Sequence, residues 1–204
     1  MTTNIKAVIF DYGNVLVEWN PRFVYQHYFP DDPEGMEAFL EEVSFMDWNA
    51  LQDKGRSFAE GVAELSRQFP QHAQLIQAYH DHWIDSIGEI YWATVDILRE
   101  LKQKGFGIYG LSNWSAETFP HIQNKYNFFQ LFDDMVISGE VGHVKPQPEI
   151  FNILLEKIGR PAQHCLFIDD SLPNIQQANT MRFNTIHFQN PTHLREELQK
   201  LQLL

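Results

Sequence analysis

Residues 7–16 read Ala-Val-Ile-Phe-Asp-Tyr-Gly-Asn-Val-Leu, an apolar run that leads into an aspartate and a Gly-Asn pair. An unbroken apolar run of this length is typical of a strand buried on both faces, as in a parallel sheet. Asp11 then lies at the carboxyl end of the strand, where open α/β sheets bind their ligands. Taken alone, the stretch also fits an ordinary strand whose last residue begins a turn.

The same pattern returns at residues 165–171, which read Cys-Leu-Phe-Ile-Asp-Asp-Ser. Here the apolar run ends in two adjacent carboxylates, Asp169 and Asp170, which repel each other unless a cation lies near them. If the two strands are neighbours, Asp11 and this pair converge on one spot. Carboxylate oxygens, water and a substrate phosphate are the ligands that Mg²⁺ prefers. The two stretches together predict a magnesium site.

The length and charge of the chain limit the classes of protein to which it can belong. Its 204 residues suit one domain, or a core domain with a smaller one inserted. A net charge of −12 argues against a nucleic-acid partner, because such binding rests on lysine and arginine contacts to phosphate. A local phosphate site remains open, since a metal ion can supply the positive charge. The single Cys165 excludes an internal disulfide and is expected to be buried.

Segments that direct a chain to a membrane are not expected. Residues 1–6 are polar and do not resemble a signal peptide. No apolar run approaches the roughly 20 residues that a membrane span needs. We therefore expect a soluble, cytoplasmic protein, a monomer or a homodimer, with no membrane partner.

Residues 18–89 differ from the rest of the chain. Strand-like runs vanish there, and apolar residues recur at helical spacing, as in Phe58, Val62 and Leu65. Ser57 and Asp53 are suited to cap helices in this segment. The pattern predicts an all-helical segment inserted immediately after the first strand.

From residue 91 onward, amphipathic helices alternate with short apolar strands, which is typical of βαβ units and a parallel sheet. The expected fold class is α/β, a Rossmann-like parallel sheet core with an inserted all-helical cap domain. We expect residues 1–17 and 90–204 to form the core and residues 18–89 to form the cap.

Further polar residues stand near the ends of other strands. Ser112 and Asn113 follow the strand expected at 106–111, and Lys145 lies between Val144 and Pro146. Each has a purely structural interpretation, because Ser and Asn commonly cap helices and a lysine is usually a solvated charge. As an ordered set with Asp11 and the acidic pair, they supply a carboxylate nucleophile, phosphate ligands, a neutralising cation and a metal site. That combination is typical of phosphoryl transfer.

Four stretches carry this pattern in order along the chain: Phe10-Asp11-Tyr12-Gly13-Asn14-Val15, Leu111-Ser112-Asn113, Lys145-Pro146, and Phe167-Ile168-Asp169-Asp170 with Asn174 and Ala178. In their order and spacing they resemble the four motifs of the haloacid dehalogenase-like (HAD) hydrolase superfamily. The helical insert after the first strand is placed like the cap domain of that superfamily. The resemblance extends over the whole chain.

The resemblance implies a reaction and a cofactor. Asp11 would attack phosphorus and form an aspartyl-phosphate, which water would later hydrolyse. Mg²⁺ would be held by Asp11, the backbone carbonyl of Gly13 and Asp170. Asp169 would lie close by as a second acidic contact to the metal.

The resemblance also implies how a small phosphorylated metabolite is bound. Ser112, Asn113 and Lys145 would bind the phosphoryl oxygens, and Lys145 would also orient the nucleophile. Substrate choice is expected to lie in the cap, where Arg22 and Trp48 are the favoured contacts. The competing interpretation is that tryptophans at helical spacing belong to a core. Further candidates in the cap are Trp19, Asn20, Asn49 and the cluster His80-Asp81-His82-Trp83.

One position departs from the usual pattern. Most phosphatases of this superfamily carry a second aspartate two residues after the nucleophile, as general acid and base, whereas this chain has Gly13. Loss of a general acid typically lowers the rate by about 10² to 10⁴. The enzyme would then need a leaving group that requires little protonation, or an acid from the cap or water. The Asp-x-Gly-Asn start is similar to the subgroup of bacterial α-D-glucose-1-phosphate phosphatase, which implies a sugar 1-phosphate substrate.

Two other functions remain open. A metal-independent 2-haloacid dehalogenase of the same superfamily would displace halide through Asp11, but it typically has Ser and Asn where this chain has Asp169 and Asp170. A non-catalytic sugar-phosphate-binding regulatory protein would keep the fold and lose turnover. Gly13 is the one sequence feature that favours this last alternative.

Overall fold

The computed structural model describes residues 4–204. Its centre is a five-stranded, fully parallel sheet with the strand order β5-β4-β1-β6-β7. The first strand of the chain is the middle strand of the sheet, so its end is surrounded by the ends of strands from later in the sequence. The strands are β1 (Ala7–Phe10), β4 (Gly107–Ser112), β5 (Asp134–Ile137), β6 (Cys165–Asp169) and β7 (Asn184–His187).

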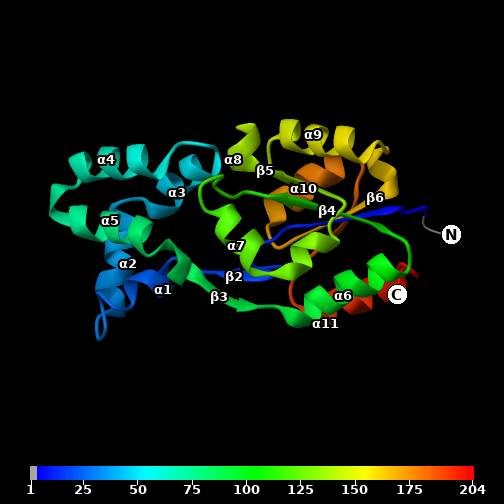
Figure 1. Ribbon diagram of the computed structural model, residues 1–204, viewed down its shortest axis with the longest axis horizontal. Helices are drawn as coiled ribbons and strands as arrows, with labels where there is room; N and C mark the ends of the chain where they lie inside the picture. The colour runs from blue at the N-terminus through cyan, green and yellow to red at the C-terminus, as the bar shows by residue number, and fades with distance from the viewer. Residues whose placement is uncertain (1–3) are drawn as a thin grey trace.

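Helices cover both faces of the sheet (Figure 1). Val8 and Phe10 of β1 share one buried cluster with α6 (Trp92–Gln103) and α11 (Pro191–Lys200). Ala7 and Ile9 share the other with α9 (Pro148–Ile158) and α10 (Leu172–Thr180). Burial on both faces explains the unbroken apolar run and confirms the predicted α/β class. The remaining helices of this part are α7 (Phe119–Lys125), α8 (Ser138–Val141), and 3₁₀ helices at Asn127–Leu131 and Ala162–His164.

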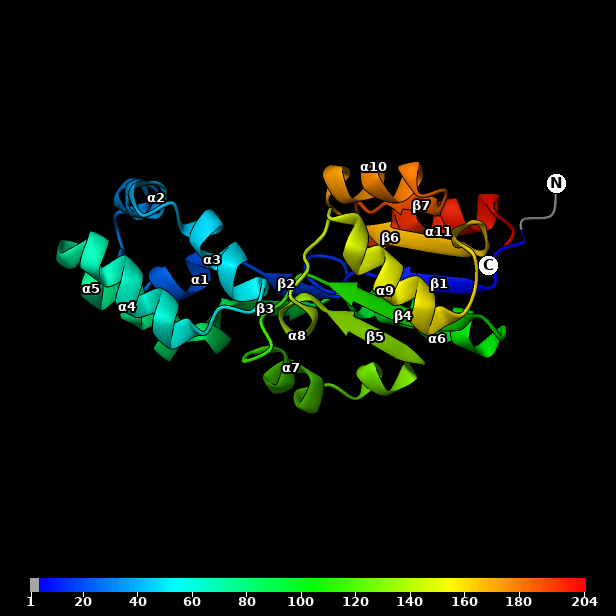
Figure 2. The same ribbon diagram turned by 90° about the horizontal axis from the view of Figure 1, so that it is seen from above.

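Residues 18–89, called the cap segment below, form a helical body beside one end of the sheet (Figures 1 and 2). Aromatic side chains fill its interior, where the rings of Phe45 and Tyr79 meet edge to face at 4.7 Å. Ser57 begins one of its helices with a complete capping box, as predicted. The helices are α1 (Arg22–Tyr25), α2 (Pro33–Glu42), α3 (Phe45–Asp53), α4 (Phe58–Gln68), α5 (Ala73–Asp81), and 3₁₀ helices at Pro70–His72 and Trp83–Ser86.

An antiparallel ribbon joins the cap segment to the sheet. The expectation that strands are absent from residues 18–89 is wrong at both ends of that range. β2 (Val17–Trp19) pairs with β3 (Ile87–Ile90), and Figure 2 shows the two strands between the helices and the sheet. The sequence did not reveal these strands because each is too short to show an alternating pattern, and their pairing joins positions far apart in the chain.

The structure also decides the expectations for Asp53 and Cys165. Asp53 caps no helix: it is the last residue of α3 rather than a residue that precedes a helix. Cys165 is buried in β6, as expected. Among residues 4–204, no helix combines the length and the apolar character that crossing a membrane requires.

Candidate active site

Three carboxylates meet where β1 and β6 end. Phe10 pairs with Ile168 across these parallel strands, so the residues that follow lie at the same edge of the sheet. One oxygen from each of Asp11, Asp169 and Asp170 lies within 4.8 Å of the other two. The structure therefore brings these side chains together as the strand pattern predicts.

Lys145 lies between two of these carboxylates. Its Nζ is 2.9 Å from Asp11 Oδ2 and 2.7 Å from Asp169 Oδ2, and it also donates to the carbonyl of Leu111 at 2.9 Å. Burial of the side chain lowers the pKa of Lys145, but the charges of Asp11 and Asp169 outweigh that effect and leave its pKa above the ordinary value. The side chain is therefore a buried ammonium rather than the solvated surface charge that the sequence also allowed.

Two residues from the end of β4 fix the geometry around this pair. Ser112 Oγ donates to Asp11 Oδ1 at 2.8 Å, and the backbone N–H of Tyr12 donates to the same oxygen at 2.7 Å. The side-chain amide of Asn113 forms two bonds to the backbone of Lys145, one to its carbonyl at 2.9 Å and one from its N–H at 2.7 Å. Ser112 thus orients a carboxylate, and Asn113 holds the segment that carries the lysine.

Asp169 and Asp170 are adjacent but have different surroundings. Asp169 is fully buried, and its two oxygens accept hydrogen bonds from Lys145 Nζ, Asn174 Nδ2 and the backbone N–H of Ser171. Asp170 instead lines the cavity described below. Asp169 is therefore bonded to the lysine, whereas Asp170 lies at the cavity wall.

The charges at this edge do not balance, because three carboxylates face one ammonium. Burial raises the pKa of Asp11 to about 7; Lys145 opposes this rise, and the charges of Asp169 and Asp170 add to it. Burial and Asp169 also raise the pKa of Asp170. A divalent cation beside Asp11 and Asp170 would compensate the excess negative charge, and an all-oxygen donor set suits Mg²⁺. The residues present thus fit such an ion.

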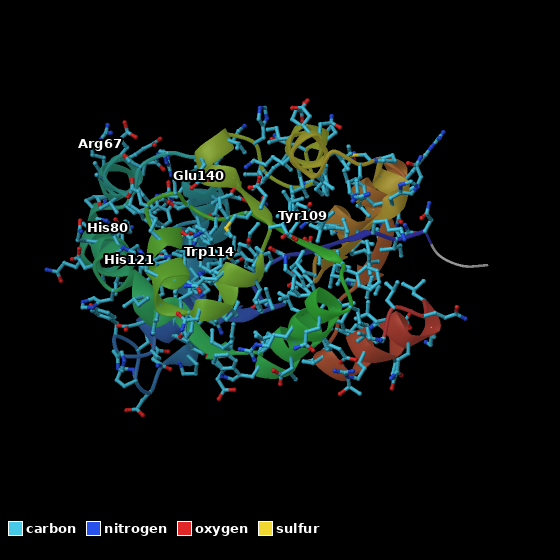
Figure 3. The ribbon with its side chains drawn as sticks, turned by 45° about the vertical axis from the view of Figure 1, so that its right-hand side comes forward. Arg67, His80, Tyr109, Trp114, His121 and Glu140 are labelled. Carbon is cyan, nitrogen blue, oxygen red and sulfur yellow. The ribbon has the colours of Figure 1, made fainter. Side chains whose placement is uncertain are left out.

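A cavity of about 440 Å³ opens between the cap segment and this edge of the sheet. The sheet side supplies Asp11, Gly13, Asn113, Lys145 and Asp170. Three tryptophans also line the cavity: Trp19, Trp83 and Trp114. The rings of Trp83 and Trp114 meet edge to face at 6.0 Å, and Figure 3 shows Trp114 between the cap segment and the part of the sheet marked by Tyr109.

One face of α3 forms the cap side of the cavity. Its lining residues are Met46, Asn49, Ala50 and Asp53, which are spaced as neighbours on one helix face. Trp48 lies on another face of α3, is buried within the cap segment, and donates its Nε1–H to the carbonyl of Gly61 at 3.0 Å. Trp48, expected to contact substrate, therefore does not line this cavity.

Arg22 is also placed away from the cavity. Strand β2 carries the chain away from the sheet edge before Arg22 is reached, and the guanidinium pairs with Glu37, with Nη2 at 2.6 Å from Oε2. Trp19, named as a lesser candidate, lines the cavity in its place. His80 stacks on the ring of Phe58 and lies with His121 at the side of the cap segment (Figure 3), not in this cavity.

Asp53 was missed as a candidate for the site. Its carboxylate accepts a hydrogen bond from Asn49 Nδ2 at 3.0 Å, and the backbone N–H of Ser115 also donates to it. Burial raises the pKa of Asp53 to about 7, although the bond from Ser115 opposes the rise. The signal that could have identified this residue is the spacing of 46, 49, 50 and 53, which makes a partly polar stripe on a helix otherwise taken as core.

Comparisons with known proteins agree with this geometry. The family model described as haloacid dehalogenase-like hydrolase matches residues 5–180. The chain is 27% identical to the sesquiterpene phosphatase astK of Aspergillus oryzae over 98% of both chains. It is 23% identical to the D-ribitol-5-phosphate phosphatase of Bacteroides thetaiotaomicron over 95% of this chain and 97% of the relative.

The fold is also shared with a solved structure. A HAD family enzyme from Bacteroides thetaiotaomicron, crystallised with magnesium and inorganic phosphate, superposes with a TM-score of 0.65 at 22% identity, over 91% of this chain and 95% of that one. One assignment follows from the family match, and it agrees with the common fold and with the polar side chains at the ends of β1, β4 and β6. This chain is a member of the haloacid dehalogenase-like hydrolase family.

Proposed function

We propose that the protein is a Mg²⁺-dependent phosphatase that hydrolyses a small phosphorylated metabolite through an aspartyl-phosphate on Asp11. The observation that carries this proposal is the buried Lys145, which bridges Asp11 and Asp169 at the floor of a cavity also lined by Asp170. Phosphoryl transfer requires an oriented carboxylate, a fixed cation and acidic oxygens close together. The phosphatases among the relatives support the same reaction.

The metal ligands in this proposal are Asp11, the backbone carbonyl of Gly13, and Asp170. When bound there, Mg²⁺ would supply positive charge to the phosphoryl oxygens. We assign Asp169 a different role from the metal contact expected at first. Its oxygens already accept bonds from Lys145, Asn174 and Ser171, so it holds Lys145 in place.

The residues of this chain divide the reaction between them. Ser112 holds Oδ1 of Asp11 and Lys145 pairs with Oδ2. An Asp11 oxygen forms a bond to phosphorus while the bond to the leaving oxygen breaks. The Lys145 ammonium faces the negative charge of the transferring group. Water then attacks the aspartyl-phosphate, which releases phosphate and restores Asp11. We propose that Asn113 contributes by fixing the backbone of Lys145.

The cap segment completes the site. We propose that residues 1–17 and 90–204 act as the catalytic core and residues 18–89 as a cap, with the β2–β3 ribbon between them. Because α3 lines the same cavity as Asp11, a closed cap excludes water while phosphorus is transferred to the aspartate, and opening admits water and releases products.

Two substrate classes are supported by different observations. The Asp-x-Gly-Asn start favours a sugar 1-phosphate, whose anomeric oxygen leaves comparatively easily. The wall formed by Trp19, Met46, Trp83 and Trp114 favours the phosphate of a larger apolar alcohol. The similarity to a sesquiterpene phosphatase supports this second class.

A panel of phosphate esters tests the proposed function. We expect phosphate release from α-D-glucose 1-phosphate or from farnesyl phosphate, and a fall in the rate on the order of 10² or more when EDTA removes the metal. Binding of a sugar phosphate without release would favour the regulatory alternative. Halide release from 2-chloropropionate without metal would establish the dehalogenase instead.

A measurement independent of turnover tests the metal site. Mg²⁺ at about 100 times its Kd is expected to stabilise the protein by about 2.7 kcal/mol. Asp170→Asn should abolish this shift, because it replaces a carboxylate ligand by a neutral amide. The exposed Asp96→Asn on α6 is the matched control. An undiminished Mg²⁺ shift in Asp170→Asn would contradict the assigned ligand.

A further inference from the structure

The position that usually carries the general acid is open space in this chain. Gly13 lies two residues after Asp11, and a Cβ added there would meet no heavy atom within 4 Å. The φ angle of Gly13 is not positive, so a residue with a side chain could adopt the same backbone conformation. The cavity therefore has room for a proton donor beside Asp11, but position 13 does not provide one.

Asp53 is the remaining carboxyl group of the cavity. Among the cavity-lining residues within 4–204, the acidic side chains are Asp11, Asp53 and Asp170. Asp11 and Asp170 are used as nucleophile and metal ligand in the proposed function. Asp53 lines the same cavity from the cap side, at the end of α3.

Contacts to the core fix Asp53 in place. Its carboxylate accepts from the backbone N–H of Ser115, a residue just beyond the end of β4, and Ser138 Oγ donates to its backbone carbonyl. Shortly after α3, the backbone N–H of Phe58 donates to the Glu117 carboxylate at 3.3 Å. The end of α3 is thus attached to the same loops that position Lys145 and Asn113, which suits a group that must meet a reacting atom.

The surroundings of Asp53 favour its protonated form. Asp53 is partly exposed. Burial is the main cause that raises its pKa, and no basic side chain within residues 4–204 contributes to that pKa. A carboxyl group whose pKa lies near 7 can hold a proton and release it to an alkoxide at neutral pH. Asn49 and Ser115 fix the carboxyl group through hydrogen bonds without supplying a positive charge.

We propose that Asp53 is the general acid of this enzyme, delivered by the cap in place of the aspartate missing at position 13. The inference rests on the proposed phosphatase reaction. As an Asp11 oxygen bonds to phosphorus, the phosphorus–oxygen bond of the ester breaks, and the leaving oxygen takes the proton of Asp53. In the second step the cap has closed again over the admitted water. Asp53, now a carboxylate, accepts a proton from this water as its oxygen bonds to phosphorus, the bond from phosphorus to Asp11 breaks, and both residues return to their starting states.

The test compares leaving groups. For Asp53→Asn we expect kcat/KM to fall by about 10² to 10⁴ with an alkyl phosphate, whose leaving oxygen needs a proton, and by less than about tenfold with p-nitrophenyl phosphate, whose leaving oxygen does not. Asp53→Glu should recover part of the loss. The matched control is Asp47→Asn, an exposed aspartate on the first turn of α3.

The outcomes separate this inference from the proposed function. Equal loss with both leaving groups would mean a structural role for Asp53, and an unchanged alkyl phosphate rate would exclude it as an acid; either result overturns the inference while wild-type activity stands. Absence of phosphate release by the wild-type enzyme from every ester would overturn the phosphatase itself and the inference with it. Circular dichroism of each variant verifies that the comparison is made between folded proteins.

Discussion

Asp11→Asn is expected to lower kcat for phosphate release by on the order of 10⁴ to 10⁶, because it removes the group that attacks phosphorus. The amide has nearly the same shape as the carboxylate, and Lys145 keeps its bond to Asp169 at 2.7 Å. Repulsion among three carboxylates is also relieved. We therefore expect the variant to be folded, with a melting temperature at least equal to that of the wild type when Mg²⁺ is absent.

The control for this variant is another aspartate substitution. Asp96→Asn changes an exposed residue on α6 that pairs with Arg99, and it should keep wild-type activity. Steady-state phosphate release measures the activity of each variant, and a thermal melt of the same samples measures its stability. Activity of Asp11→Asn within about tenfold of the wild type would exclude Asp11 as the nucleophile.

Lys145→Met is expected to damage both stability and activity. The side chain is 1% exposed and pairs with Asp11 and Asp169, so its loss leaves two buried carboxylates without their cation. Breaking a buried pair in this way costs about 3–5 kcal/mol of the free energy of unfolding. The rate should fall by on the order of 10² to 10³, because the charge facing the phosphoryl group is lost.

The pH dependence of the free energy of unfolding distinguishes the loss of the Lys145 charge from a packing defect. The pKa of Lys145 is raised in the folded state, so its contribution to stability is fully present below its ordinary pKa and is lost as pH rises through the raised value. The stability difference between wild type and Lys145→Met should narrow in alkaline solution, where the ammonium loses its proton, and also in acid, where protonation of Asp11 and Asp169 removes the charges with which it pairs. Urea denaturation over this range measures it, with the exposed Lys104→Met as control. A difference that is constant up to alkaline pH would mean that packing, not charge, accounts for the loss.

The convergence of the acidic groups was predictable because they follow strand-like apolar runs, whereas Lys145, also expected near a strand end, follows helix α8 instead. Asp11 and Asp169 come directly after apolar runs, and parallel strands bring their carboxyl ends together regardless of the details of packing. The sequence therefore identified the groups and their convergence. The sequence did not show that Asp169 and Asp170 have different surroundings. That difference depends on Lys145 and Asn174, which bond to Asp169 from other parts of the chain.

The cap side of the cavity was less predictable. Helix α3 carries large apolar residues on more than one face, and Met46 is 58% exposed whereas Trp48 is 6% exposed. Spacing alone did not tell which face meets the core, so Trp48 was expected at the substrate and Asp53 was taken as a cap. Arg22 was expected at the cavity from its nearness in sequence to Asp11, but the ribbon strand β2 separates them.

The most direct test of the account is to trap the intermediate. Enzyme with Mg²⁺ and its best phosphate ester would be quenched during turnover and treated with borohydride, which reduces an acyl phosphate but not a free carboxylate. Peptide mass spectrometry then locates the modified residue. We predict homoserine at position 11, absent when substrate is omitted and absent in Asp11→Asn. An unmodified Asp11 in samples that are turning over, or reduction at another aspartate, would contradict the aspartyl-phosphate mechanism.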